Sequence, residues 1–187
     1  MHLLFDNLTA NIIGGTLILV MIAINIGIQK MGIERAVVHT AKEGLLSMAE
    51  IIEQDMYLMG QDLKSGEEPI ISQTNTSIEL QYRKNPADVS PTVIKYERVF
   101  ADSIITEQDT LLVYKLVRKE NGVDSGESLP YLTFVNFRLL DDNNNIVGSS
   151  DAKKVRVRLG MALPFRFTDG TVRELYWGST FRPIALQ

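Results

Sequence analysis

The chain has 187 residues with 19 basic and 23 acidic side chains, a formal net charge of −4 at pH 7, and no cysteine. This acidic balance argues against a nucleic-acid-binding surface, and the lack of cysteine excludes disulfides and thiolate metal sites. About 150 residues follow residue 30, enough for one domain with its own hydrophobic core.

The first element is an apolar segment, Leu8 to Ile28, that contains no charged side chain. Before Lys30, the only formally charged residue is Asp6. A helix of this length, rising about 1.5 Å per residue, spans the hydrocarbon core of a bilayer. Buried helices of soluble domains are rarely apolar on every face. The segment therefore predicts a helix within a membrane or within the core of a filament.

The segment does not have the pattern of a cleaved secretory signal, which needs a basic start and a small-residue cleavage site. We therefore expect it to stay in the mature protein. The basic residues Lys30, Arg35 and Lys42 follow it, on the side that the positive-inside tendency assigns to the cytoplasm. Three explanations stay open: the N-terminus lies outside, a basic leader preceded this sequence, or the chain departs from the tendency.

A helical repeat continues beyond the apolar segment. Apolar residues recur at spacings of three or four, which places them on one helix face: Ile33, Val37, Ala41, Leu45, Met48, Ile52, Met56 and Met59. The charged residues are assigned to the opposite face: Glu34, Lys42, Glu43, Glu50, Glu53 and Asp55. We predict one helix from about residue 6 to residue 60, with any break near Gly14-Gly15 or Gly32 and a C-terminal cap near Gly60.

β-type runs separated by turn residues follow a loop at 65–69. In Lys154–Leu159, apolar and basic residues alternate, as in a half-buried antiparallel strand. The expected strands are 77–82, 93–100, 110–119, 131–140, 154–159 and 171–181. The predicted fold class is α+β, a long N-terminal helix, apolar and then amphipathic, packed on an antiparallel sheet. The predicted domains are residues 1–30 and a head at 31–187, with a helix at 31–62 and a β-rich part at 75–187.

Several short motifs in this order resemble the type IV pilin superfamily, in particular the larger minor pilins and the type II secretion pseudopilins of the W/J type. The helix end is similar to the family pattern L-x-x-D-x-x-x-x-G, with Asp55 and Gly60 in place. The segments Phe134–Asp142 leading to Gly148, and Val155–Leu159, are similar to strand patterns of the family. The family's start G-F-T-L-I-E is not present, and the nearest carboxylate is Asp6.

The resemblance implies a structural subunit of an extracellular or periplasmic filament, in the inner membrane before assembly and with copies of itself or related subunits as partners. It implies no enzyme activity and no cofactor. The expected assembly residues are Asp6, Gly14, Gly15, Leu17 and Val20. The expected core face of the head is Val37, Ala41, Leu45, Met48, Ile52 and Met56. Asp6 would pair with a neighbour's N-terminal amine, or cap the helix.

The Gly14-Gly15 pair lies inside the apolar helix. Small residues allow neighbouring helices to approach closely, and each glycine lowers the cost of local unwinding. Both effects suit a helix bundle in a filament core. In a simple single-pass anchor, the pair would be neutral.

The sequence contains no phosphate-binding glycine loop, no G-x-S-x-G and no H-E-x-x-H motif. The alternating oxygens of Asp141-x-Asn143-x-Asn145 are similar to a calcium loop, but the following glycine and the terminal Glu are missing, which favours an ordinary hairpin loop. No metal site is predicted.

Two further functions stay open on these patterns. The first is a single-pass membrane protein that does not polymerise and carries a β-rich binding domain in an envelope complex. The second is a virion structural protein with an apolar anchoring helix.

Overall fold

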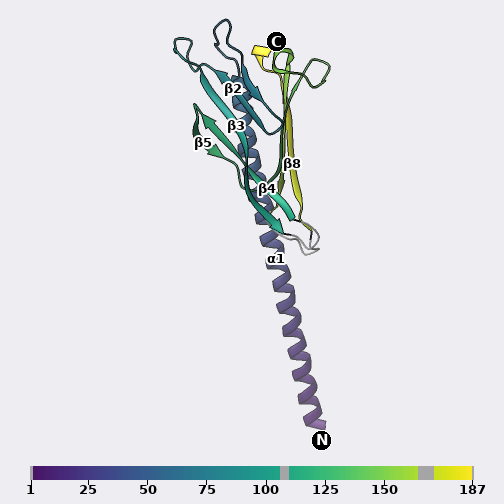
Figure 1. Ribbon diagram of the computed structural model, residues 1–187. Helices are drawn as coiled ribbons and strands as arrows, with labels where there is room; N and C mark the ends of the chain where they lie inside the picture. The colour runs from purple at the N-terminus through teal and green to yellow at the C-terminus, as the bar shows by residue number, and fades with distance from the viewer. Residues whose placement is uncertain (1, 106–109, 164–170, 187) are drawn as a thin grey trace. The chain divides into compact units, whose positions relative to one another are not determined.

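The computed structural model describes the backbone of residues 2–105, 110–163 and 171–186, and side chains within these ranges from Asn7 onward. The chain divides into two compact units, Met1–His39 and Thr40–Gln187. A single helix, α1 (His2–Leu58), belongs to both units (Figure 1).

Unit 1 consists of the first part of α1. The helix runs through Gly14-Gly15 and Gly32 without a break. Each glycine lowers helix stability by about 1 kcal/mol, yet the helix continues across all three. From Asn7 to Ile33, every residue except the half-buried Gly14 is exposed.

Unit 2 contains the rest of α1 and an antiparallel sheet. The strands are β1 (Ile70–Gln73), β2 (Ser77–Tyr82), β3 (Thr92–Ile105), β4 (Thr110–Glu120), β5 (Val123–Glu127), β6 (Leu132–Leu140), β7 (Lys154–Ala162) and β8 (Glu174–Phe181). Their order is β1-β2-β3-β4-β6-β7-β8, and β5 pairs with β4. Two 3₁₀ turns, η1 (Ser149–Asp151) and η2 (Ile184–Leu186), follow β6 and β8. The predicted α+β class is confirmed.

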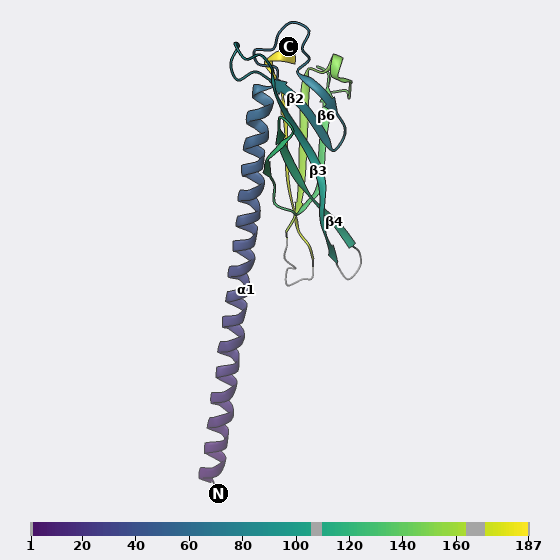
Figure 2. The ribbon, with the colours of Figure 1, turned by 60° about the vertical axis from the view of Figure 1, so that its left-hand side comes forward.

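The core of unit 2 lies between α1 and the sheet, whose strands run along one side of the helix (Figure 2). The helix contributes buried residues at the predicted spacing, Ala41, Leu45, Met48, Ile52 and Met56, and Met59 directly after its end is also buried. The sheet contributes alternate residues of its strands, among them Ile78, Ile94, Leu116, Phe137 and Val157. Val37 belongs to unit 1 and is half-buried, and Ile33 is exposed. The fully buried stripe therefore begins at Ala41.

Two strands have no counterpart among the six expected ones, β1 and β5. All five residues of β5 are exposed, so no alternation of apolar and polar residues marks the strand. It forms because Asn121 and Gly122, with φ of 51° and 81°, make the two-residue turn that joins antiparallel strands. The Asn-Gly pair in the sequence is the signal that would have predicted this hairpin.

Replacing Ile52 with Asp tests the buried stripe. Ile52 is fully buried, so a carboxylate there would have no partner and would lower the free energy of unfolding by about 4 kcal/mol or more. Leu46→Asp is the matched control, since Leu46 is 43 % exposed and the change should cost about 0.5 kcal/mol. The measurement is thermal melting of the full chain in detergent, followed by near-UV circular dichroism. Equal melting temperatures for both variants would contradict this core.

Replacing Gly60 with Ala tests the end of α1. Gly60 has φ of 78°, and a Cβ there would lie 2.1 Å from the Cβ of Ala185 and 3.0 Å from that of Pro69. The backbone strain and the clash should together cost about 2 kcal/mol or more. In Gly66→Ala, φ is 94° but nothing lies within 4 Å, so only the strain of about 1 kcal/mol applies. Equal losses of unfolding free energy in the two variants would show that tight packing at Gly60 is not what requires glycine.

Candidate functional site

The largest exposed apolar surface belongs to the N-terminal part of α1. Its large apolar side chains from Leu8 to Ile28 are each 49–67 % exposed. By length and composition, the helix is able to cross a membrane, and none of its most apolar window is buried. Soluble monomers rarely expose an apolar surface of this size, and the length and composition of the helix are compatible with a membrane anchor.

The predicted assembly residues lie on this surface. Gly15, Leu17 and Val20 are exposed, and Gly14 is half-buried. A Cβ added at Gly14 or Gly15 would meet nothing within 4 Å, so no contact within the chain requires glycine at either position. The side chain of Asp6 lies outside the described residues.

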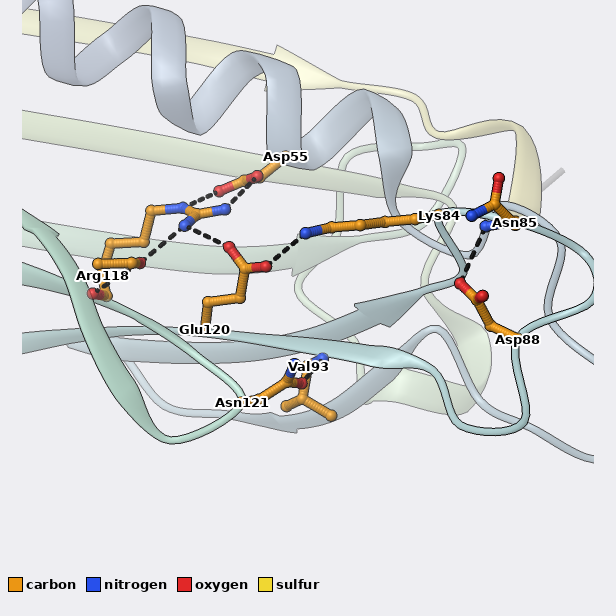
Figure 3. Close-up of polar contacts among 9 residues, drawn as sticks. Asp55, Lys84, Asn85, Asp88, Val93, Arg118, Glu120 and Asn121 are labelled. Carbon is orange, nitrogen blue, oxygen red and sulfur yellow. Dashed lines mark hydrogen bonds and ion pairs between the residues drawn. The ribbon is translucent and has the colours of Figure 1, made fainter.

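The second feature is a buried polar cluster that joins α1 to the sheet (Figure 3). Asp55 of α1 is 3 % exposed and accepts two hydrogen bonds from the guanidinium of Arg118 in β4, from Nε to Oδ2 at 2.7 Å and from Nη2 to Oδ1 at 3.0 Å. The hydroxyl of Tyr96 in β3 donates to the same carboxylate. This bidentate geometry is the strongest form of a charge-assisted pair.

The cluster continues to the surface through Glu120. Arg118 Nη1 donates to Ser125 Oγ at 2.7 Å and to Glu120 Oε2 at 3.3 Å. Lys84 Nζ donates to Glu120 Oε1 at 2.5 Å (Figure 3). Each charge in the cluster therefore has a partner of opposite sign.

The environment shifts several pKa values in this cluster, among them that of Lys84, which its hydrogen bond to Glu120 raises. Burial, together with the neighbouring Asp55 carboxylate, raises the pKa of Tyr96. The hydrogen bond to Asp55 raises the pKa of Arg118, and the hydrogen bond from Lys84 lowers the pKa of Glu120. The pKa shifts of Tyr96 and Arg118 leave both residues in their ordinary neutral-pH forms, a neutral donor and a cation. The hydrogen bonds of Asp55 to Arg118 of β4 and Tyr96 of β3 join α1 to the sheet.

The position of Asp55 corrects the sequence analysis, which assigned this residue to the charged, outward face of the helix. Hydropathy groups a carboxylate with the other charged residues and carries no information about Arg118, which lies 63 residues away in sequence. The separation of Asp55 from Ile52 by three residues, and from Met56 by one, places it beside the core face. This spacing is the feature of the sequence that would have predicted a position at the border of the core.

A groove lies beside the cluster, between α1 and the β5 region of unit 2. Its volume is about 620 Å³, and its walls include Met48, Ile51 and Leu58 of α1 and residues 125–127. Arg83 also lines it, is almost fully buried, and donates to Glu67 and to the Asp88 carbonyl. Within the described part of the chain, Arg83 Nε has no acceptor.

In the Asp141–Asn145 loop, the carboxylate of Asp141 accepts hydrogen bonds from within the turn. Asp141 accepts from the Asn145 backbone N–H at 2.8 Å and from Asn145 Nδ2 at 2.9 Å. These bonds lower the pKa of Asp141. Across residues 7–105, 110–163 and 171–186, no three His, Cys, Asp or Glu side chains gather as a metal site.

Neither a protein-family model, nor a curated protein, nor a solved structure matches this chain.

A double-mutant cycle tests the joint between α1 and β4. Asp55→Ala leaves the Arg118 side chain, which is 13 % exposed, without its main partner, and should lower the free energy of unfolding by about 3–5 kcal/mol. Arg118→Met should have a comparable effect, because it isolates Asp55. The Asp55→Ala/Arg118→Met double variant should lose less than the sum of the two, by at least about 1 kcal/mol. Simple additivity in chemical denaturation would show that the two residues do not act as a pair.

Proposed function

We propose that this chain is a structural subunit of a pilin-like filament. It would reside in the cytoplasmic membrane before assembly and then in a cell-surface or periplasmic filament, next to copies of itself or related subunits. The observation that carries the proposal is the exposed apolar helix in unit 1, coupled with a head whose own core is complete. The pilin-like order of the helix and the antiparallel sheet also supports it.

The energetics favour burial of the helix against other helices or lipid. Burial of a large apolar side chain contributes about 1.5–3 kcal/mol, and twelve such residues from Leu8 to Ile28 are about half exposed. Their combined contribution, even after the loss of translational and rotational freedom on association, would drive association. In a filament, copies of the helix would cover one another. Gly14 and Gly15 would then permit close approach of helices.

The second candidate function is a single-pass membrane protein that does not polymerise. The same exposed helix favours it, because a bilayer covers an apolar helix as effectively as neighbouring helices do. The two functions predict different effects when Gly14 and Gly15 are replaced. A lipid-facing glycine is replaceable by a larger apolar residue, whereas a glycine at a close helix contact is not.

The test is to replace both Gly14 and Gly15 with Leu in the full-length protein. Filaments should be lost or become much rarer, because two bulky side chains would separate the helices. Gly27→Leu adds the same side chain to the same helix, where a Cβ also meets nothing within 4 Å, and filaments should persist. Electron microscopy of sheared surface material, with mass spectrometry to show that the filaments contain this chain, provides the measurement.

Two results would contradict the proposal. If the unmodified protein is found in the membrane but in no filament, the single-pass function takes its place. If the Gly14/Gly15 double variant polymerises as well as the unmodified chain, close helix packing at these residues is wrong. Leu17→Lys provides no discrimination, because a charge at mid-helix costs roughly 2.5–3.5 kcal/mol on insertion in either case.

A further inference from the structure

Strand β8 forms an open edge of the sheet. It is the last strand in the sheet order and pairs with β7 across eight residues without a register shift. In Figure 1 it is the long yellow strand labelled β8. Within the described part of the chain, no strand pairs with its other edge. Natural edge strands are usually protected by lysine, proline, a bulge or short length, and β8 has no lysine or proline and no shift of register with β7.

Three arginines lie on β6 and β7, the two strands that precede β8 in the sheet order, on the sheet face opposite to the buried residues of these strands. Arg138 of β6 is directly across from Arg156 of β7, and Arg158 follows two residues along β7. No ion pair joins any of the three to a carboxylate among the described residues. Like charges directly opposite each other destabilise a sheet. The arrangement is therefore unfavourable in the isolated chain and would be relieved by an external anion.

Small residues of β8 allow the arginine side chains to lie over the edge strand. Gly178 pairs with Arg158, and a Cβ at Gly178 would lie 3.2 Å from Arg158 Cγ. Thr180 pairs with Arg156 and accepts a hydrogen bond from its Nε at 3.2 Å. A depression of about 330 Å³ lies at this place, lined by Arg156, Arg158 and residues 178–180. The guanidinium groups therefore lie close to the open backbone.

An aromatic residue extends this surface along β8. Tyr176 is 67 % exposed, and its ring lies 5.9 Å from that of Phe134. Gly160, the residue between them in the register, makes room for this contact, because a Cβ there would lie 2.4 Å from the Phe134 ring. One face of β8 thus presents an aromatic ring, then Arg158 over Gly178, then Arg156 beside Thr180.

We propose that the β8 edge binds an extended segment of a partner protein, which adds to the sheet as a further strand. The backbone of the segment would bond to the open edge, and its alternate side chains would lie on the arginine face. The residue opposite Tyr176 is apolar, and those opposite Gly178 and Thr180 are Asp or Glu. Guanidinium–carboxylate pairs are short and strong, so the arginines select the acidic positions.

A second copy of β8 is a poorer occupant of this site than an acidic segment. It has one carboxylate on this face, Glu174, which already accepts a hydrogen bond from Tyr176, and it would add the Arg156 and Arg158 side chains of the other copy to the same face. Repulsion between like charges would oppose this contact. Binding of the acidic segment requires only the β8 edge and its arginines. The site is therefore present whether or not the chain polymerises.

The experiment measures binding of a fluorescent peptide to the full chain in non-ionic detergent, which keeps the chain dispersed. The peptides are Thr-Leu-Thr-Glu-Thr-Glu-Thr and its reverse, for the two possible strand directions, and the same peptides with Lys in place of Glu. At least one Glu peptide should bind, and the Lys peptides should not. Hydrogen exchange should slow at amides of β8 and not at those of β1, the opposite edge of the sheet.

Arg158→Glu should weaken binding of the Glu peptide by about tenfold or more, because it removes one charge-assisted contact and adds repulsion. Lys64→Glu changes the charge equally at an exposed site in another loop and should leave binding nearly unchanged. Gly178→Val is a second variant, which blocks the depression without any change of charge and should also weaken binding. Near-UV circular dichroism verifies that each variant is folded.

Several outcomes overturn the proposal. These are absence of binding by either Glu peptide, equal binding by the Lys peptides, no protection of β8, or equal affinity for folded Arg158→Glu and Lys64→Glu variants. Tighter binding of a single-stranded oligonucleotide without protection of β8 would assign the arginines to a polyanion instead. None of these results depends on filaments, so failure here is distinguishable from failure of the proposed function.

Discussion

Burial of one face of α1 on the sheet is the constraint on which the head depends. From Ala41 to Met59, each turn of the helix places an apolar side chain against the strands. Hydrophobic burial is non-directional, so this stripe alone would permit small shifts of the helix along the sheet. Asp55 removes that freedom, because its carboxylate is satisfied by Arg118 and Tyr96 in only one position.

The two parts of α1 differ in how their apolar residues are covered. In unit 2, its apolar face is covered by the chain itself, and charged residues such as Glu50 remain exposed. In unit 1, the apolar residues surround the helix and are exposed on every side. The proposed filament and the proposed single-pass anchor are two ways to cover the apolar surface of unit 1.

The sheet has a second surface whose chemistry differs from that of the helix. The face with Arg138, Arg156 and Arg158 is charged, and β8 beside it has an open backbone edge. Interactions there would be directional and dependent on salt, unlike the apolar contacts of α1. The two surfaces are therefore suited to different partners, one covering the helix and the other completing the sheet.

Local periodicity is enough to predict the elements whose signals lie within one segment. The continuous apolar run, the three- and four-residue spacing from Ala41 to Met59, and the alternation in β2 and β7 each follow from periodicity within one segment. The α+β class and the order of helix and strands followed from them. The boundaries of the long strands β3 and β7 were less well predicted, because their ends lie outside the regular alternation.

Features that join distant segments became visible only in the folded chain. Asp55 pairs with a residue 63 positions away, and nothing in either local pattern indicates the other. In the sequence, the arginines of β6 and β7 have the pattern of ordinary outward-facing strand residues. The register places them in a row beside an open edge, because strand pairing brings together side chains that the chain order keeps apart.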